Sequence, residues 1–402
     1  MIKLRVVVLS DTGFGIGGGV PLACTMYSKL NTTYLGNEVI SISLPTDLPR
    51  VGFARAVGKI PIIRGLHNAT FNKIIEDLNK RLGVELVHAN ILDPRYAYFL
   101  SNATKKLNLP LVITVHTWEY LCPTSYNVML PRMIPCNKSS LNRHCIGCSI
   151  SLGRLRKDPV EKTVVGTTQL LYTSYAFRTL MNRSDCVISP SKLFATKLYE
   201  KLNIVSYHVP NPVDAGTFGE RVGTEGDSSV AFIGRLEYEK GIQLLVALAR
   251  ILDKTDIHVA GKGSLERFLR GIQLPNVIYH GFITEDKKLG LLRKATVMVV
   301  PSIWCEMYGY TVLEAFTLGK PVVAFDLGGP KELVEASGGG LLAKPFDIRD
   351  FAEKVRYLVE NPSEAKKMGY DGRKWAERNV HPRYCAKKLA KAYEVAMASS
   401  HH

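Results

Sequence analysis

Short apolar runs alternate with segments of helical spacing along the first half of the chain. Leu4–Ser10, Val84–Ala89 and Leu111–Val115 are rich in β-branched residues and predict buried strands. Val20–Leu35 and Tyr96–Leu107 carry apolar residues at helical spacing. Strands that alternate with helices of this length predict βαβ units and a parallel sheet.

A second series of the same kind begins after Asp214. Ser229–Ile233 and Val297–Val300 predict strands, and Gly241–Leu252 and Thr311–Leu318 predict helices. Two prolines and then a Gly- and Glu-rich stretch separate the two series, so we expect the domain boundary there. We therefore predict an α/β protein of two doubly wound domains that face each other across a cleft, with ligands at the carboxyl ends of the strands.

The predicted domain organisation follows from these two series. The N-terminal domain covers residues 1–210, with a cysteine-rich insertion at about 117–160, and the C-terminal domain covers 211–375. A helix at 376–396 is expected to pack back on the N-terminal domain, and 398–402 is interpreted as the remnant of an expression tag. At 402 residues the chain is long enough for two hydrophobic cores.

Composition favours a soluble protein whose first half is strongly basic. Hydrophobic residues make up 46% and charged residues 22% of the chain, and no apolar run is long enough to span a bilayer. The first strand is too short and too soon followed by Asp11 to be a secretory signal, so we expect a cytoplasmic location. Residues 1–210 carry a net charge of +13 out of +16, which indicates an anionic partner or simply solubility.

The clearest candidate chemistry follows the first strand of the second domain. Gly234 ends that strand, and Arg235 and Lys240 come before the next helix. Two cations and the positive end of a helix suit a diphosphate, because a guanidinium binds two oxygens and an ammonium acts as a point charge. The ordinary alternative is a helix start with surface charges.

Two glutamates follow another strand of this domain. Glu306 lies in the loop after the strand, and Glu314 lies about one turn into the next helix. Between them, Met307, Tyr308 and Gly309 offer backbone N–H groups at a helix N-terminus, which suits an anion. One carboxylate can accept hydrogen bonds from sugar hydroxyls and the other from a ribose diol; alternatively, Glu314 merely stabilises the helix dipole.

The ordered set of motifs resembles the retaining glycosyltransferases of the GT-B fold, specifically glycosyltransferase family 4. That family is similar in having a Gly-Gly loop after its first strand, an Asn-Pro-x-Asp linker, a Gly-Arg…Lys-Gly turn and a Glu-x7-Glu signature. All four occur here in this order, and the likeness runs from about residue 5 to about 395. The resemblance implies a retaining enzyme that moves a sugar from a nucleotide-diphosphate sugar.

The resemblance also implies roles for individual residues. Arg235 and Lys240 match the pair that holds the donor pyrophosphate, and Glu306 matches the acid that contacts the donor sugar beside the amides of Met307–Gly309. Glu314 matches the ribose ligand. The remaining matches are Ile283 at the nucleobase, Gly18 and Gly19 in the loop that closes over the phosphates, and His116 near the transferred sugar. Family members commonly follow that histidine with Asp, whereas Thr117 stands at that position here.

Four cysteines lie close together after His116. Cys145 and Cys148 have the spacing of zinc ligands, whereas Cys122 and Cys136 are less regularly spaced. A structural zinc could hold this segment, which has little helix or strand pattern of its own; a disulfide or free thiols are the alternatives. We expect no cofactor for catalysis, because the chain has no Asp-x-Asp and two cations can neutralise a diphosphate.

The positive charge of the first domain indicates which binding partners to expect. Arg50–Arg81 interleaves basic and apolar residues, which suits an anionic membrane surface or a lipid-phosphate acceptor, or is a solvated face around a core helix. We expect a UDP-, GDP- or ADP-sugar donor and a lipid-linked or polymeric glycan acceptor at the cytoplasmic membrane face. Alternatives are a GT-B transferase or epimerase acting on a soluble molecule, and a basic nucleic-acid-binding protein, for which no recognised motif occurs.

Overall fold

The computed structural model describes most of the chain. The described residues are 3–10, 19–43, 76–77, 79–90, 94–122, 124, 128–129, 134–136, 143–155, 168, 172, 175–213 and 227–399. They form two compact units. Unit 1 comprises Met1–Arg132, Cys136–Pro212 and Pro382–His402, and unit 2 comprises Met133–Pro135 and Val213–His381.

Unit 1 is built on a parallel sheet of six strands in the order β2-β1-β3-β4-β7-β8. Its strands are β1 (Arg5–Ser10), β2 (Glu38–Ser43), β3 (Leu86–Asn90), β4 (Leu111–Thr114), β7 (Cys186–Ser189) and β8 (Tyr207–His208). The inner strands β3, β4 and β7 are buried throughout, as expected for parallel strands that are covered on both faces.

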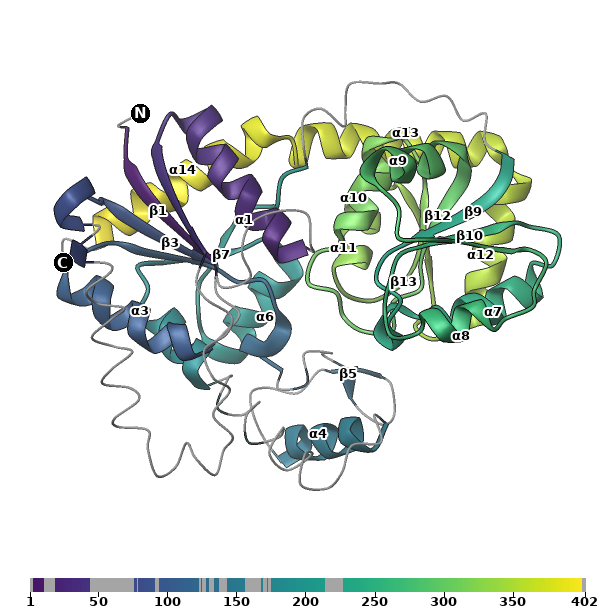
Figure 1. Cartoon of the computed structure of the whole chain (residues 1–402), viewed down its shortest axis with the longest axis horizontal. Coiled ribbons are helices and arrows are strands. Elements are labelled where there is room, and N and C mark those ends of the chain that lie inside the picture. The colour runs from purple at the N-terminus through teal and green to yellow at the C-terminus, as the bar shows by residue number, and fades with distance from the viewer. Residues whose placement is uncertain are drawn as a thin grey trace. The chain divides into compact units, whose positions relative to one another are not determined.

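Helices cover both faces of this sheet (Figure 1). Those over one face are α1 (Gly19–Lys29), the π-helix η1 (Leu30–Leu35) and α14 (Pro382–Ser399), and those over the other are α3 (Pro94–Lys106) and α6 (Lys192–Leu202). The helix α14 packs on η1, β4 and β7. The Tyr393 hydroxyl in this helix forms a 2.8 Å hydrogen bond with His88 Nδ1 of β3. The C-terminal segment thereby completes the core of unit 1.

The predicted helix at Val20–Leu35 changes form at its end. It is α-helical from Gly19 to Lys29 and continues as a π-helix from Leu30 to Leu35. Asn31 is buried there and its amide donates to the Tyr27 carbonyl at 2.9 Å. A buried side chain that bonds to the backbone in this way favours a widened turn.

Between β4 and α6 the described residues form short elements. They are η2 (Trp118–Tyr120), β5 (Val128–Met129), β6 (Ile134–Pro135) and α4 (Arg143–Leu155). The expectation that the cysteine-rich insertion has little regular structure is wrong for its second half. In the helix α4, Cys145 and Cys148 stand three positions apart and so lie on the same side.

Unit 2 has a second parallel sheet of six strands, in the order β11-β10-β9-β12-β13-β14. Its strands are β9 (Asp227–Ile233), β10 (Ile257–Ala260), β11 (Val277–Gly281), β12 (Ala295–Val300), β13 (Val322–Phe325) and β14 (Gly340–Ala343). The order reverses between β9 and β12, and doubly wound sheets bind ligands beyond the carboxyl ends of their strands at such a point.

The helices of unit 2 also lie on both faces of its sheet (Figure 1). They are α7 (Ile242–Ile251), α8 (Glu266–Arg270), α9 (Glu285–Lys294), α10 (Tyr310–Thr317), α11 (Gly328–Ser337), α12 (Ile348–Glu360) and α13 (Pro362–Asn379). Residues of α9, α10, α11 and α13 share one buried apolar cluster with β12 and β13. Both sheets confirm the predicted α/β class with two doubly wound units.

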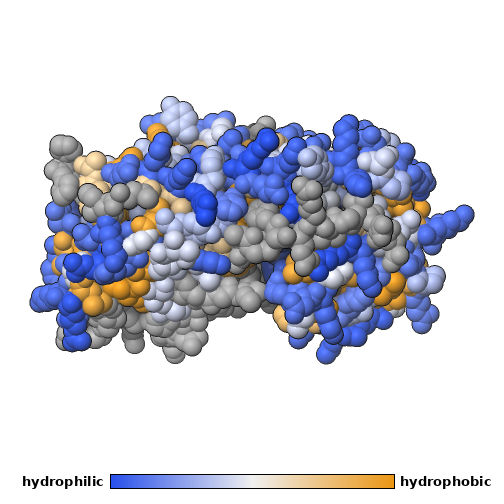
Figure 2. All heavy atoms as spheres, turned by 90° about the horizontal axis from the view of Figure 1, so that it is seen from above, coloured by the Kyte–Doolittle hydropathy of each residue, from blue (hydrophilic) through white to orange (hydrophobic). Residues whose placement is uncertain are grey.

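The surface is largely polar. Figure 2 shows hydrophilic residues over most of one face, with apolar residues in small separate groups. Exposed apolar side chains such as Tyr199, Val205 and Phe282 come from separate segments of the chain. In the described part of the chain, no helix is both long enough and apolar enough to cross a membrane.

Candidate functional site

The predicted donor residues gather where the strand order of unit 2 reverses. Gly234 and Arg235 follow β9, and the loop from Pro301 to Gly309 follows the neighbouring strand β12. Since β9 and β12 are parallel neighbours, their carboxyl ends lie side by side. This position is where a doubly wound fold places a ligand.

The turn after β9 rests directly on the loop after β12. A short 3-10 helix, η4 (Tyr238–Lys240), ends at Gly241, which has a φ of +76°. A Cβ atom on Gly241 would stand 2.0 Å from the Pro301 carbonyl oxygen, so only glycine fits. The Ile303 amide also donates to the Glu239 carbonyl at 2.9 Å. These contacts hold Lys240 against the loop that carries Glu306.

Lys240 and Glu306 form a largely buried ion pair. Lys240 Nζ lies 2.8 Å from Glu306 Oε1, and the two side chains are 18% and 9% exposed. The Ser302 hydroxyl also donates to Glu306 Oε1. Burial alone would raise the pKa of Glu306, but the Lys240 ammonium, the Ser302 hydroxyl and the Arg235 guanidinium together hold it below its usual value. Glu306 is therefore a carboxylate at neutral pH.

Arg235 differs from Lys240 in its exposure. Its side chain is 59% exposed, and its guanidinium is 3.3 Å from Glu239 Oε1, one turn further along. Such an exposed pair contributes little to stability. The guanidinium can therefore exchange Glu239 for a more highly charged anion at small cost, whereas the Lys240 ammonium is fixed by Glu306.

The loop that follows Glu306 is buried and is held by a pair of glycines. Met307 and Tyr308 are buried, and Gly309 is the N-cap residue of the helix α10. A Cβ atom on Gly329 would stand 2.2 Å from the Tyr308 carbonyl oxygen, and the Gly329 amide donates to the Glu306 carbonyl at 2.7 Å. The N-terminus of α11 thus packs on the backbone of residues 306–308, and two helix N-termini, those of α10 and α11, flank this loop.

Glu314 lies within α10 and is held by a lysine from another helix. Lys288 Nζ in α9 lies 2.9 Å from Glu314 Oε1 and 2.7 Å from Glu285 Oε2. Burial raises the pKa of Glu314 even though the Lys288 ammonium acts in the opposite direction. The same two carboxylates raise the pKa of Lys288 against the effect of its burial. Glu314 therefore forms an ion pair of its own, separate from the pair of Lys240 and Glu306.

The remaining residue of unit 2 that is predicted to bind the donor follows the edge strand of the sheet. Ile283 follows β11 and is half-buried, and its neighbour Phe282 is exposed, with Lys262 Nζ 5.3 Å from the centre of the ring. Lys262 comes from the turn after β10, so the turns after β10 and β11 meet here. This arrangement offers an aromatic and a cationic group beside Ile283.

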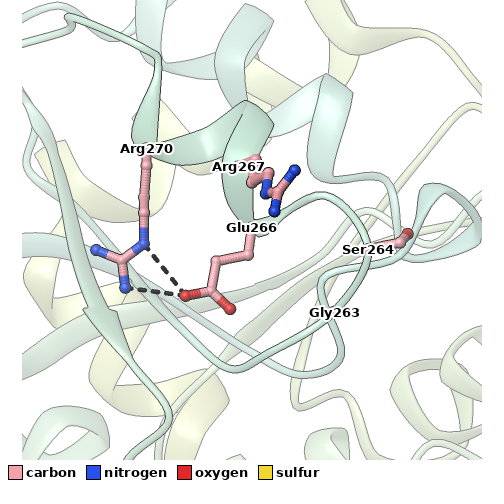
Figure 3. Close-up of a pocket in the computed structure, with 5 residues that line it drawn as sticks. All are labelled: Gly263, Ser264, Glu266, Arg267 and Arg270. Atoms are coloured by element: carbon pink, nitrogen blue, oxygen red, sulfur yellow. Dashed lines mark hydrogen bonds and ion pairs between the residues drawn. The ribbon is translucent and has the colours of Figure 1, made fainter.

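A polar hollow of about 600 Å³ opens next to the turn after β10 (Figure 3). Arg270 makes two hydrogen bonds to Glu266, at 3.1 and 2.9 Å, whereas Arg267 points away from that pair. Ser264 connects the hollow to the turn after β9, because its amide and hydroxyl donate to Glu237 at 3.0 and 2.5 Å. The hollow lies beside the turn that carries Arg235 and Lys240 but does not include either residue. Its lining residues are Gly263, Ser264, Glu266, Arg267 and Arg270.

In unit 1, His116 lies beyond the carboxyl end of β4 and contacts the last residue of β3. His116 Nε2 is 2.7 Å from Asn90 Oδ1. Desolvation lowers the pKa of His116 to about 3, so the ring is neutral at physiological pH, although part of the residue remains exposed. Gly19 is the first residue of α1. Gly18 lies outside the described residues, as does most of the basic stretch Arg50–Arg81.

The four clustered cysteines are described, and all are thiols in the structure. Among the residues that the structure describes, no group of three or more His, Cys, Asp or Glu side chains is arranged to hold a metal ion. Cys145 and Cys148 share one side of α4, and Cys122 Sγ lies 3.3 Å from the Thr124 hydroxyl. The zinc site stays a prediction.

Several residues of the site were not predicted from the sequence. Lys288 and Ser302 hold the two predicted glutamates, Asn90 holds His116, and Gly328 and Gly329 support the loop after Glu306. A Gly-Gly-Pro run two residues after the strand β13 was a usable signal for the two glycines. The other three are ordinary polar residues in the sequence, and only the fold brings them to their partners.

Comparisons with known proteins give matches to residues 219–375 and to the fold. Residues 219–375 match the model of the family described as "Glycosyl transferases group 1". An uncharacterized glycosyltransferase of Methanocaldococcus jannaschii is 28% identical over 225 residues, which are 55% of this chain and 62% of that protein. A 2-deoxystreptamine N-acetyl-D-glucosaminyltransferase of Niallia circulans is 26% identical over 298 residues, which are 70% of each chain. The chain thus spans less than two thirds of the length of the first of these relatives.

Solved structures show the same fold. The sucrose-phosphate synthase of Thermosynechococcus elongatus superposes with a TM-score of 0.71 at 18% identity, covering 98% of each chain. Anabaena HepE in complex with UDP-glucose superposes with a TM-score of 0.64 at 15% identity, covering 98% of this chain and all of that one. The fold is GT-B. The match to the glycosyl transferases group 1 model is confined to residues 219–375, which lie within unit 2.

Proposed function

We propose that this protein is a retaining glycosyltransferase of family 4 that uses a nucleotide-diphosphate sugar as donor. The observation that carries the proposal is the buried pair of Lys240 and Glu306 beside Arg235, at the point where the sheet order of unit 2 reverses. A diphosphate brings two negative charges, and this point offers two cations and two helix N-termini. The family match over residues 219–375 covers all of these groups.

Each residue then has a part in the transfer. Lys240 and Arg235 bind the diphosphate, Glu306 accepts hydrogen bonds from sugar hydroxyls, and Glu314 accepts from the ribose diol. The bond from the sugar C1 to the donor phosphate oxygen breaks, and a bond from C1 to the acceptor oxygen forms on the same face. The acceptor proton passes to an oxygen of the departing diphosphate, whose charge the two cations neutralise. No metal ion is needed in this scheme.

UDP is the first nucleotide to test, since UDP-glucose is bound in the Anabaena HepE structure. The preferred acceptor in our proposal is a lipid-linked or polymeric glycan at the cytoplasmic membrane face, because residues 1–210 carry a net charge of +13. The Niallia circulans relative, by its name, acts on 2-deoxystreptamine. That name supports a soluble acceptor as the second candidate.

A donor turnover assay tests the proposal. The protein is incubated with UDP-, GDP- and ADP-sugars in the presence of EDTA, and release of the nucleoside diphosphate is measured. We expect release from one donor without added metal, and a loss of about a hundredfold or more in Lys240→Ala, as when charge stabilisation of a leaving group is removed. NMR of the glycoside product gives the anomeric configuration. Inversion, or unchanged turnover in Lys240→Ala, would contradict the proposed mechanism.

A further inference from the structure

Asn90 occupies the ligand-binding position of the sheet in unit 1. The strand order β2-β1-β3-β4 reverses between β1 and β3, and Asn90 is the last residue of β3. Its side chain is fully buried. A doubly wound sheet binds ligands beyond the carboxyl ends of strands at this point, so a buried amide here faces the region where a substrate is expected.

The hydrogen bond between Asn90 and His116 determines where the imidazole proton lies. His116 Nε2 is 2.7 Å from Asn90 Oδ1, and an amide oxygen can only accept. Nε2 therefore carries the hydrogen, and a neutral ring then has a lone pair on Nδ1. If the amide were turned over, Asn90 would donate to Nε2 and Nδ1 would carry the hydrogen instead. The two arrangements predict opposite tautomers.

The other end of the amide has an unsatisfied donor. Asn90 Nδ2 is buried and has no hydrogen-bond partner within the part of the chain that the structure describes. A buried amide donor without a partner costs about 1–3 kcal/mol. Such a group is expected at a site where a ligand supplies the missing acceptor.

The surroundings keep His116 neutral. The titratable groups that the described residues bring near its ring are Tyr27 from α1, with ring centres 6.4 Å apart, and His88 from β3. Burial lowers the pKa of both histidines to about 3 and raises the pKa of Tyr27, so all three are neutral at pH 7. Asp11 and Asp93 follow β1 and β3 in the sequence and lie outside the described residues.

We propose that Asn90 is a positioning residue that holds His116 with Nδ1 unprotonated, so that the pair offers one acceptor and one donor to hydroxyl groups of the sugar substrate. His116 Nδ1 accepts from one hydroxyl, and Asn90 Nδ2 donates to a hydroxyl oxygen. This assignment rests on the proposed glycosyltransferase function. In this assignment, Asn90 and His116 together recognise a polyol. Asn90 takes the place of an acid directly after His116, because Thr117 stands at that position.

Two variants distinguish an effect on the tautomer of His116 from an effect on folding. Asn90→Asp keeps an oxygen acceptor for Nε2 but adds a charge that stabilises the imidazolium, so the pKa of His116 should rise. Asn90→Leu keeps the approximate volume and removes the acceptor. Asn31→Leu is the matched control, because Asn31 is an equally buried amide of unit 1 that bonds to Tyr27, Asn37 and Tyr393 rather than to His116.

The first measurement needs no substrate. Imidazole ¹⁵N–¹H NMR of the full chain, with His116→Gln to assign the signals, reports which ring nitrogen carries the proton. We expect a protonated Nε2 in the wild type, in Asn90→Asp and in Asn31→Leu, and a mixture of tautomers in Asn90→Leu. Asp11→Asn and Asp93→Asn should leave the titration of His116 unchanged. A protonated Nδ1 in the wild type, or the wild-type tautomer in Asn90→Leu, would overturn the proposal.

The second measurement is the pH profile of donor turnover. Asn90→Asp should stay within about tenfold of the wild type at alkaline pH and lose turnover as pH falls through the raised pKa of His116. Asn90→Leu should lose about 10–100-fold in kcat at every pH, the usual effect of removing a group that orients another. Wild-type pH profiles in both variants would refute the role of Asn90. Absence of turnover in the wild type would instead refute the proposed function, and the NMR result would still decide the tautomer.

Discussion

Lys240 Nζ lies 2.8 Å from Glu306 Oε1, and this ion pair joins the turn after β9 to the loop after β12. Both residues are largely buried, and Glu306 also accepts from the Ser302 hydroxyl. A buried carboxylate with a cationic partner stays ionised, and the cation is fixed in place. Under the proposed function, the pair fixes the lysine before a diphosphate binds, so that little of the binding free energy is spent on ordering the side chain.

The pH dependence of stability should reveal this pair. In the wild type, the pKa of Glu306 lies below its usual value, so the ionised carboxylate stabilises the folded state above about pH 4.5, and this contribution is lost as pH falls. In Lys240→Met, burial without the ammonium should raise that pKa above the unfolded value. The free energy of unfolding of this variant should be about 3 kcal/mol lower than that of the wild type at pH 7, and the difference should shrink as pH falls.

Urea unfolding of the wild type and of Lys240→Met between pH 5 and 7 measures how the difference in their free energies of unfolding depends on pH. The double variant Lys240→Met/Glu306→Gln is the control, because it removes both charges and should recover most of the lost stability at pH 7. If Lys240→Met is destabilised equally at every pH, the ion pair does not control the ionisation of Glu306.

Gly329 should be required for nucleotide binding, even though it carries no functional group. In Gly329→Ala the new methyl would stand 2.2 Å from the Tyr308 carbonyl oxygen, so the loop 306–308 must move. We expect a loss of about 1–3 kcal/mol in stability and a UDP Kd that is at least about tenfold weaker. Thermal unfolding with and without UDP measures both effects.

Gly290→Ala is the matched control for this variant. Gly290 lies in α9, and a Cβ atom there would meet nothing within 4 Å. Alanine should stabilise the helix by up to about 1 kcal/mol and leave the UDP-induced rise in Tm unchanged. Equal UDP responses of the two alanine variants would show that the loop after Glu306 does not contact the nucleotide.

Glu314 should act on the ribose and not on the diphosphate. Glu314→Gln keeps the shape of the side chain but removes the negative charge of the carboxylate, which accepts hydrogen bonds from a diol. We expect UDP to bind at least about tenfold more weakly and inorganic pyrophosphate to bind as in the wild type, because a hydrogen bond to a charged group contributes about 1.5–3 kcal/mol. Isothermal titration with both ligands measures this.

Glu285→Gln provides the comparison for that experiment. Glu285 pairs with the same lysine, Lys288, but its side chain is half exposed and it begins α9 outside the predicted site. Its variant should bind UDP as the wild type does. Equal weakening of UDP binding in the two variants would mean that Glu314 acts only by holding Lys288.

Sequence reasoning found the parts of the site that a local pattern specifies. Arg235, Lys240, Glu306 and Glu314 stand next to strand ends or helix starts, and strand ends are readable from apolar periodicity. The pattern could not reveal that Lys288 in α9 reaches Glu314 in α10, because that contact depends on how two helices pack on the sheet. Such a lysine looks like any solvated residue of a helix.

The elements that differed from expectation have local causes. The π-helix Leu30–Leu35 has ordinary helical spacing in the sequence, and the buried amide of Asn31 distinguishes it only in the folded chain. The helix α4 was missed because two glycines, four cysteine or serine residues and few strong helix formers weaken its pattern. Asn90 ends the strand β3 and His116 follows the strand β4, so only the sheet order makes them neighbours.

In our proposal, unit 2 binds a nucleoside diphosphate through Arg235, Lys240 and the loop after Glu306. Isothermal titration of the full chain with UDP, GDP and ADP, repeated on Arg235→Ala/Lys240→Ala, tests it most directly. We predict one molecule of at least one diphosphate bound per chain, and an affinity at least about a hundredfold weaker in the double variant, since two charged contacts are lost. Binding of none of the three diphosphates, or equal binding by the double variant, would contradict the account.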